Sequence, residues 1–103
     1  MKNNLANKKF DFIGVYMKSE DDFNTTLKYF ASAIKKFTGL PVSMVNKNSF
    51  ITVNKELYTF ITLDNKIKEN IFKQVFIDKD INTEDIERII KPTLIDKNNI
   101  ERF

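Results

Sequence analysis

The sequence predicts a single α+β domain built on one antiparallel or mixed sheet of four or five strands. A chain of 103 residues has the length of one domain. Short segments rich in β-branched and aromatic residues alternate with amphipathic helical patterns, and only two glycines and two prolines interrupt the chain. We expect the domain to span residues 9–95, with a flexible basic tail at 1–8 and a C-terminal tail at 96–103.

The first strand is predicted at residues 9–18, where side chains alternate between two faces. One face carries Ile13, Val15 and Met17, and the other carries Phe10, Phe12 and Tyr16. Gly14 lies on the aromatic face, where a missing side chain allows a bulge or the close approach of a neighbour.

A long helix is predicted next, over about residues 20–37, on one face of the sheet. Ser19 has the character of an N-cap, and the three acids that follow suit the positive end of a helix. The apolar residues recur at spacings of four and three: Phe23, Leu27, Phe30, Ile34 and Phe37. Gly39 is placed to end the helix, and Pro41 prevents its return.

Three strands are predicted to follow as a meander, at residues 42–45, 49–53 and 57–63. Asparagines at the breaks between them tolerate the positive φ of tight turns. If residues 42–53 form one bent strand instead, the topology becomes a ferredoxin-like β-α-β-β-α-β arrangement.

Two shorter helices are predicted towards the C-terminus. Asp64 is the candidate N-cap of the first, although residues 74–77 fit a short strand equally well. The inward side chains of that helix are expected to be Ile67, Ile71, Phe72, Val75 and Phe76. Thr83 is the candidate N-cap of the second, which Pro92 ends, and residues 93–95 are expected to add an edge strand.

The predicted strands sort their side chains into an aliphatic and an aromatic face. The aliphatic face carries Ile13, Val15, Met17, Ile51, Val53, Leu57, Ile61 and Leu63, and we expect the long helix to cover it. The aromatic face carries Phe10, Phe12, Tyr16, Phe50, Tyr58 and Phe60. Three fates are open for this second face: burial under the later helices, contact with a protein, or stacking of nucleic-acid bases.

The absence of certain residue types excludes several chemistries. The chain has no cysteine and no histidine, which removes disulfides, thiolate metal sites and the commonest general base. Residues 78–85 place Asp78, Asp80 and Asn82 at calcium-loop spacing, but the required glycine and bidentate glutamate are missing. We therefore expect no metal, no cofactor and no enzymatic activity.

The charge pattern and the hydropathy indicate where the protein is located and which partners it can have. The net charge of +3 comes from Lys2, Lys8 and Lys9, since residues 10–103 carry 14 basic and 14 acidic groups. No apolar run is long enough to cross a bilayer or to serve as a signal peptide, so a soluble cytoplasmic protein is expected.

The sequence predicts a non-catalytic protein-interaction module. Phe, Ile, Lys and Asn make up 50 of the 103 residues, a composition typical of AT-rich genomes and compatible with an accessory, mobile-element or viral effector protein. The expected partner is another protein or a second copy in a homodimer. The alternative is a single-stranded nucleic-acid-binding protein that uses aromatic stacking and flanking lysines. The candidate binding residues are Phe10, Phe12, Tyr16, Phe50, Tyr58, Phe60, Lys9, Lys18 and Lys55.

Overall fold

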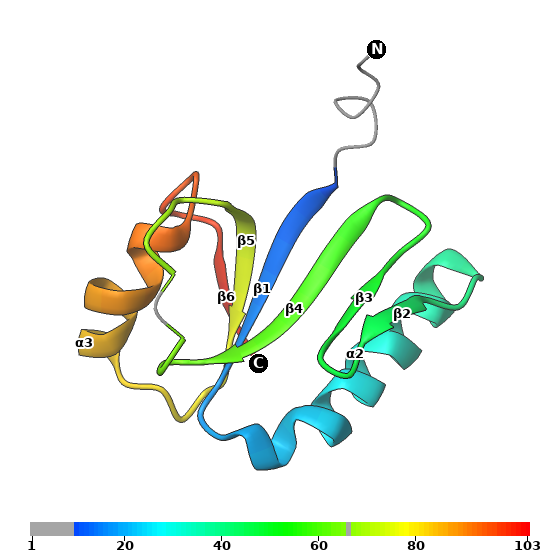
Figure 1. The fold of residues 1–103 in the computed structure, drawn as a ribbon, viewed down its shortest axis with the longest axis horizontal. Coiled ribbons are helices and arrows are strands. Elements are labelled where there is room, and N and C mark those ends of the chain that lie inside the picture. The colour runs from blue at the N-terminus through cyan, green and yellow to red at the C-terminus, as the bar shows by residue number, and fades with distance from the viewer. Residues whose placement is uncertain (1–9, 66) are drawn as a thin grey trace.

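The computed structural model describes residues 10–65 and 67–103 and shows a small α+β domain (Figure 1). The described residues form one mixed sheet of six strands and two α-helices. The strands are β1 (Asp11–Met17), β2 (Ser43–Asn46), β3 (Ser49–Ile51), β4 (Glu56–Thr62), β5 (Phe72–Ile77) and β6 (Ile100–Arg102). The helices are α2 (Phe23–Thr38) and α3 (Thr83–Asp85).

The strand order is β2-β3-β4-β1-β5-β6, with β1 near the centre. β1 runs parallel to both β4 and β5, and β5 runs parallel to β6. The segment β2-β3-β4 is the antiparallel meander that the sequence predicts, with a turn at residues 47–48 between β2 and β3. This turn excludes the single bent strand and with it the ferredoxin-like alternative.

Local signals at both ends explain the position of α2. The Ser19 hydroxyl accepts a hydrogen bond from the Asp21 amide at 3.1 Å and starts the short 3-10 helix η1 (Glu20–Asp22), which leads into α2. At the other end Gly39 adopts a φ of 80°, and its N–H donates to the Lys35 carbonyl at 2.7 Å. The prediction of a long helix at about 20–37 is confirmed.

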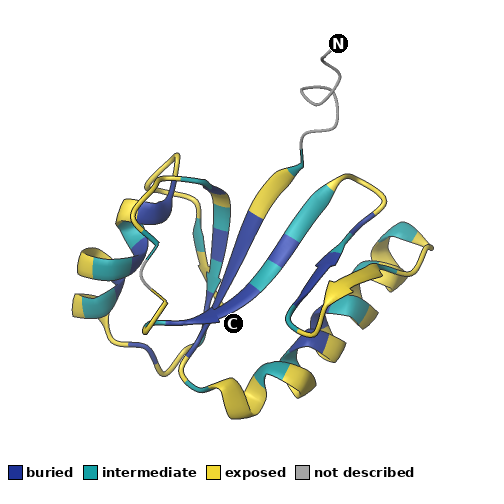
Figure 2. Cartoon of the chain, in the orientation of Figure 1, coloured by how far each residue is buried: buried dark blue, intermediate teal, exposed yellow. Residues whose placement is uncertain are grey.

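Two layers cover opposite faces of the sheet, and they are offset from each other (Figures 1 and 2). Beneath α2 lies one core, here called the α2 core: Ile13, Val15, Met17, Leu27, Phe30, Phe50, Tyr58 and Phe60. On the other face the segment around α3 covers the α3 core: Tyr16, Ile61, Phe72, Val75, Ile77, Ile81, Ile86, Ile90 and Leu94. Figure 2 shows β2 and the outward side of α2 exposed, and the later part of β1 and the end of β4 buried.

The predicted helix at 64–76 is wrong, because residues 72–77 form β5, and the alternative of a strand at 74–77 is confirmed. A register shift between Phe12 and Ile13 of β1 places an extra residue in β5, so Phe12 pairs with Phe72 and Gly14 with Val75. Phe72 and Val75 are thus three positions apart, yet both belong to the α3 core. A spacing of three is the signature of a helix, which explains the error.

The C-terminal region differs from the prediction in three further ways. α3 has Asn82 rather than Thr83 as its N-cap, and it continues as a π turn, η2 (Ile86–Ile90), and a 3-10 turn, η3 (Lys91–Thr93), which contains Pro92. The expected edge strand at 93–95 is reduced to an isolated bridge between Leu94 and Phe72. Part of the expected tail at 96–103 forms β6. The sheet therefore has six strands rather than four or five, and α2 and α3 replace the three predicted helices.

Among the described residues, no helix combines the length and the apolar character needed to cross a bilayer.

Candidate functional site

The predicted aromatic face does not form, because the strand register mixes the two sets of side chains. Neighbours in a parallel pair share a face of the sheet. Ile13 of β1 pairs with Tyr58 of β4, and Val15 pairs with Phe60. The prediction placed these residues on opposite faces, and it is wrong.

Most of the predicted aromatic residues are core residues. Tyr16, Phe50, Tyr58 and Phe60 are buried, whereas Phe10 is half-buried and Phe12 is 38% exposed. Phe50 stacks on Tyr58 with 5.1 Å between ring centroids. Burial raises the pKa of Tyr16 and, with a smaller contribution from Glu56, raises the pKa of Tyr58 to about 12. These rings are not available as a stacking platform in this fold.

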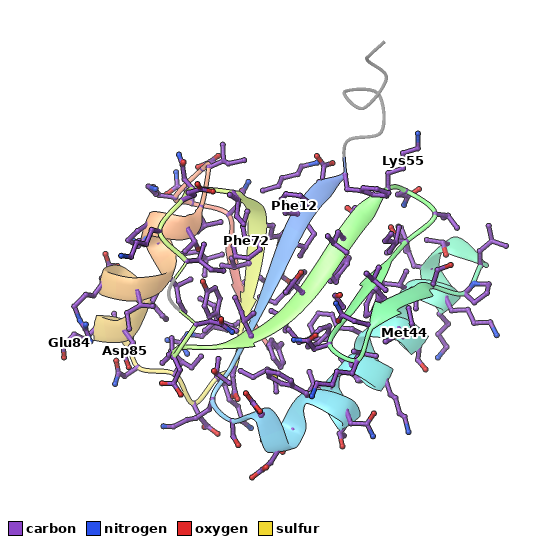
Figure 3. All side chains as sticks on the ribbon, in the orientation of Figure 1. Phe12, Met44, Lys55, Phe72, Glu84 and Asp85 are labelled. Atoms are coloured by element: carbon purple, nitrogen blue, oxygen red, sulfur yellow. The ribbon has the colours of Figure 1, made fainter. Side chains whose placement is uncertain are left out.

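The two predicted lysines that the structure describes, Lys18 and Lys55, lie at opposite ends of β1. The Lys18 ammonium donates to the Asp80 carbonyl at 3.3 Å, beyond the C-terminal end of β1. Lys55 occupies the turn between β3 and β4 with a φ of 63°. Lys9 lies outside the described residues. Phe12 and Lys55 are labelled in Figure 3, where Phe12 lies beside Phe72 on the neighbouring strand.

The structure instead offers an apolar groove between α2 and the C-terminal strands. The aromatic groove, as we call it, has a volume of about 310 Å³. Its lining residues are Tyr29, Phe30, Ala33, Ile34, Phe37, Tyr58, Phe76, Glu101, Arg102 and Phe103. Tyr29 and Phe37 are 68% and 88% exposed and project from α2 at the edge of the groove. Large aromatic side chains that are this exposed beside an apolar groove are typical of surfaces that contact another molecule.

The groove exists because the two covering layers are offset. α2 and the α3 segment cover different parts of the sheet, so the α2 side of β5 and β6 stays partly open. Phe76 and Phe103 lie there as partly buried neighbours of the α2 core. The Phe30 ring closes the inner wall, with centroid distances of 5.2 Å to Phe76 and 5.3 Å to Phe103.

The sequence assigns Phe37 to the buried stripe of the helix, and its exposure corrects that assignment. Phe37 follows Phe30 by seven residues, which is two turns, so it points in a similar direction. At the last turn of α2 nothing in the described chain covers its ring. Helical periodicity sets the direction of a side chain, but the extent of the layer beneath determines its burial.

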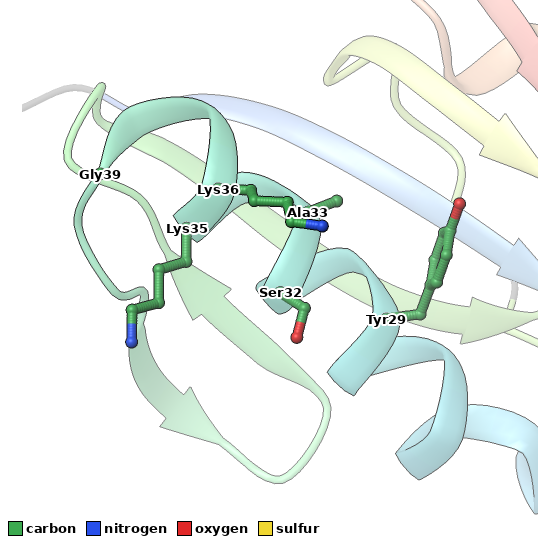
Figure 4. A pocket seen from close by; sticks show the side chains of 6 residues that line it. All are labelled: Tyr29, Ser32, Ala33, Lys35, Lys36 and Gly39. Atoms are coloured by element: carbon green, nitrogen blue, oxygen red, sulfur yellow. The ribbon is translucent and has the colours of Figure 1, made fainter.

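A second hollow adjoins the groove on the outer side of α2 (Figure 4). This lysine recess, with a volume of about 650 Å³, is lined by Tyr29, Ser32, Ala33, Lys35, Lys36 and Gly39. In Figure 4, Tyr29 lies at one end of the recess and Lys35 and Lys36 lie towards the other. The small side chains of Ser32 and Ala33 lie between them. Tyr29 and Ala33 line both hollows, so the aromatic groove and the lysine recess are adjacent and share these two side chains as a common wall.

The carboxylates near the C-terminal ends of β1 and β5 have structural roles. Asp78 Oδ2 accepts from the Lys18 amide at 3.2 Å, and its Oδ1 accepts from the Asp80 amide at 3.0 Å. Asn82 Oδ1 accepts from the Asp85 amide at 2.8 Å. Within residues 10–65 and 67–103, no group of three His, Cys, Asp or Glu side chains is arranged to hold a metal ion.

The surface features of this domain are therefore an aromatic groove and an adjoining lysine recess, both on α2. Comparisons of the chain with protein-family models, with curated proteins and with solved structures gave no match.

Proposed function

We propose that this protein is a non-catalytic module that binds another protein through the aromatic groove. The observation that carries the proposal is the exposure of Tyr29 and Phe37 beside a groove with aromatic walls. Exposed apolar patches with polar surroundings are typical of interaction sites, and aromatic side chains are enriched at the centres of interfaces.

The shape of the groove favours a protein partner over an enclosed small molecule. Its volume of about 310 Å³ is at the lower end of the range for small-molecule pockets. Tyr29 and Phe37 project into solvent and do not close over the groove. An apolar side chain of a partner can enter between them and contact Phe76 and Phe103 below, in the manner of a helix or peptide that docks in a groove.

The residue types present support a binding role without catalysis. The chain lacks histidine and cysteine, the usual proton-transfer and thiol groups. The two buried tyrosines have raised pKa values and stay protonated at neutral pH.

The proposal can be tested by selecting peptides from a random display library against the wild-type protein. Binding of the enriched peptides is then measured to a variant with Tyr29→Ser and Phe37→Ser. Each substitution removes a large apolar contact, so we expect affinity to fall at least about tenfold. The control is Ile95→Ser, since Ile95 is also exposed (63%) but does not line the groove.

Two results would contradict the proposal. One is a set of selected peptides that bind the double variant and the wild type equally well. The other is a failure to enrich any peptide, together with oligothymidine binding that quenches tyrosine emission and weakens steeply with salt. The chain has no tryptophan, and of its three tyrosines only Tyr29 is exposed, so quenching by contact with a bound base reports on Tyr29 at the edge of the groove.

A further inference from the structure

We infer that the segment bound in the aromatic groove is an acidic amphipathic peptide whose carboxylates occupy the lysine recess. The inference rests on the proposed function, because it names the chemistry of the partner for that same site. It follows from the adjacency of the two hollows and from the charges around them.

One ligand can occupy both hollows. Tyr29 and Ala33 separate them, and because Ala33 is small, a bound segment can cross from one hollow to the other beside the Tyr29 ring. A helix or extended segment that places apolar side chains in the groove therefore has its neighbouring side chains over the recess.

The recess is positively charged. α2 contains Lys28, Lys35 and Lys36 and no acidic residue. Lysines near a helix C-terminus interact favourably with the helix dipole. Within the described part of the chain, however, none of these three lysines forms an ion pair. Two ammonium groups beside an apolar groove complement a partner with carboxylates next to apolar side chains.

The same charges disfavour a second copy whose α2 packs parallel to the first, because the lysines of the two helices would come together. Like charges placed opposite each other across an interface cost binding energy. An antiparallel pair would place Glu20–Asp22, which directly precede α2, near Lys35 and Lys36 of the other copy, and a dimer of the free protein in sedimentation would replace the peptide by a second copy.

Nucleic acid is a poorer match than an acidic peptide. The basic and acidic groups balance over residues 10–103, so the domain lacks the extended excess of positive charge that a long polyanion needs, whereas a short peptide needs only the local charge of Lys35 and Lys36. Glu101 lies in the wall of the groove and accepts a hydrogen bond from Gln74 at 3.2 Å, so the acidic side chains of the peptide belong over the recess and only apolar side chains enter the groove.

The test uses three synthetic peptides of about 15 residues, long enough to form a helix on binding. All three carry Leu and Phe at positions i, i+3, i+4 and i+7, and they differ only in having Glu, Gln or Lys at the remaining positions. Affinity is measured by titration at low and high salt, and the bound site is mapped by amide chemical shifts. We expect the Glu peptide to bind about tenfold more tightly than the Lys peptide at low salt, with a smaller difference at high salt.

A charge reversal provides the matched control. Lys35→Glu with Lys36→Glu should reverse the order of the Glu and Lys peptides. Lys47→Glu with Lys68→Glu changes the net charge by the same amount at two exposed sites outside both hollows, and it should keep the wild-type order.

The outcomes separate this inference from the proposed function. Equal binding of all three peptides at the groove, unaffected by the charge reversal, would overturn the acidic partner and leave the groove as a binding site. Chemical shifts that map away from α2 and β6, with affinities insensitive to Tyr29→Ser and Phe37→Ser, would overturn both. Binding of oligothymidine that depends on Lys35 and Lys36, without binding of the Glu peptide, would replace the acidic peptide by nucleic acid.

Discussion

The ring of Phe72 lies directly over Gly14, so close that a Cβ atom at position 14 would come within 2.9 Å of the Phe72 Cε2 atom. The two residues belong to β5 and β1, and the register shift between these strands brings the ring to this place. A buried ring in the α3 core thus takes the space that a side chain at position 14 would need.

Gly14→Ala is therefore expected to destabilise the protein. Added volume in a packed core typically costs about 1–3 kcal/mol, and Phe72 is buried among neighbours that limit its movement. Urea denaturation measures the change in the free energy of unfolding. The double variant Gly14→Ala with Phe72→Leu should lose less stability than the sum of the two single changes, because the smaller side chain makes room. Strict additivity would show that the contact is not the cause.

Phe30 and Phe37 lie on the same helix, but their truncation should have very different effects. Phe30→Ala removes a ring that packs against Phe60 at 5.6 Å and Phe76 at 5.2 Å, and such changes cost about 3–5 kcal/mol. Phe37→Ala removes an exposed ring and should change stability by less than about 0.5 kcal/mol. Thermal or urea unfolding of both variants checks the contrast. A similar loss for the two variants would mean that Phe37 is buried in solution.

The N-cap of α3 provides a third prediction. Asn82 accepts a hydrogen bond from the Asp85 amide at 2.8 Å, so Asn82→Ala should cost about 0.5–2 kcal/mol. Thr83→Ala should have a smaller effect, because Thr83 is the first residue of α3 and not its cap. Chemical denaturation of the two variants distinguishes them. A larger loss for Thr83→Ala would restore the capping role that the sequence predicts for Thr83.

Alkaline pH is expected to weaken the fold through Tyr58. Burial and the nearby Glu56 raise its pKa from 10.0 to about 12 in the folded protein. Because the pKa of Tyr58 is higher in the folded than in the unfolded protein, its protonated form stabilises the fold fully below pH 10. This stabilisation is lost as the pH rises from about 10 to about 12. The measurement is the free energy of unfolding across this interval. Tyr58→Phe should show a smaller decline than the wild type, and an identical decline in both proteins would refute the assignment.

Local patterns are sufficient to predict α2 and the first four strands, but not how β1 and β4 align in the sheet. The cap at Ser19, the apolar stripe and Gly39 act within the helix itself, so they can be read from neighbouring residues. The faces of the strands depend on how β1 and β4 align, although more than 40 residues separate Ile13 from its partner Tyr58. Side chains do alternate between the two faces within β1 and within β4, as predicted. No local pattern, however, determines which face of β1 lies on the same side of the sheet as which face of β4.

The candidate site could not be predicted for a related reason. The exposure of Phe37 depends on where the sheet beneath α2 ends. Its neighbours in the groove include Phe103, which comes from a segment interpreted as a tail. The sequence shows the aromatic residues themselves, and only the arrangement of the two layers separates those in the core from those at the surface.

The offset of the two covering layers also affects how cooperatively the domain unfolds. The parallel pair β1 and β4 contributes to both cores, since Val15 and Phe60 belong to the α2 core while Tyr16 and Ile61 belong to the α3 core. Loss of either layer removes contacts from this shared pair, which couples the two halves into one cooperative unit. In native-state hydrogen exchange, the central amides of β1 and β4 should be the slowest to exchange, and those of β2 at the exposed edge should be among the fastest.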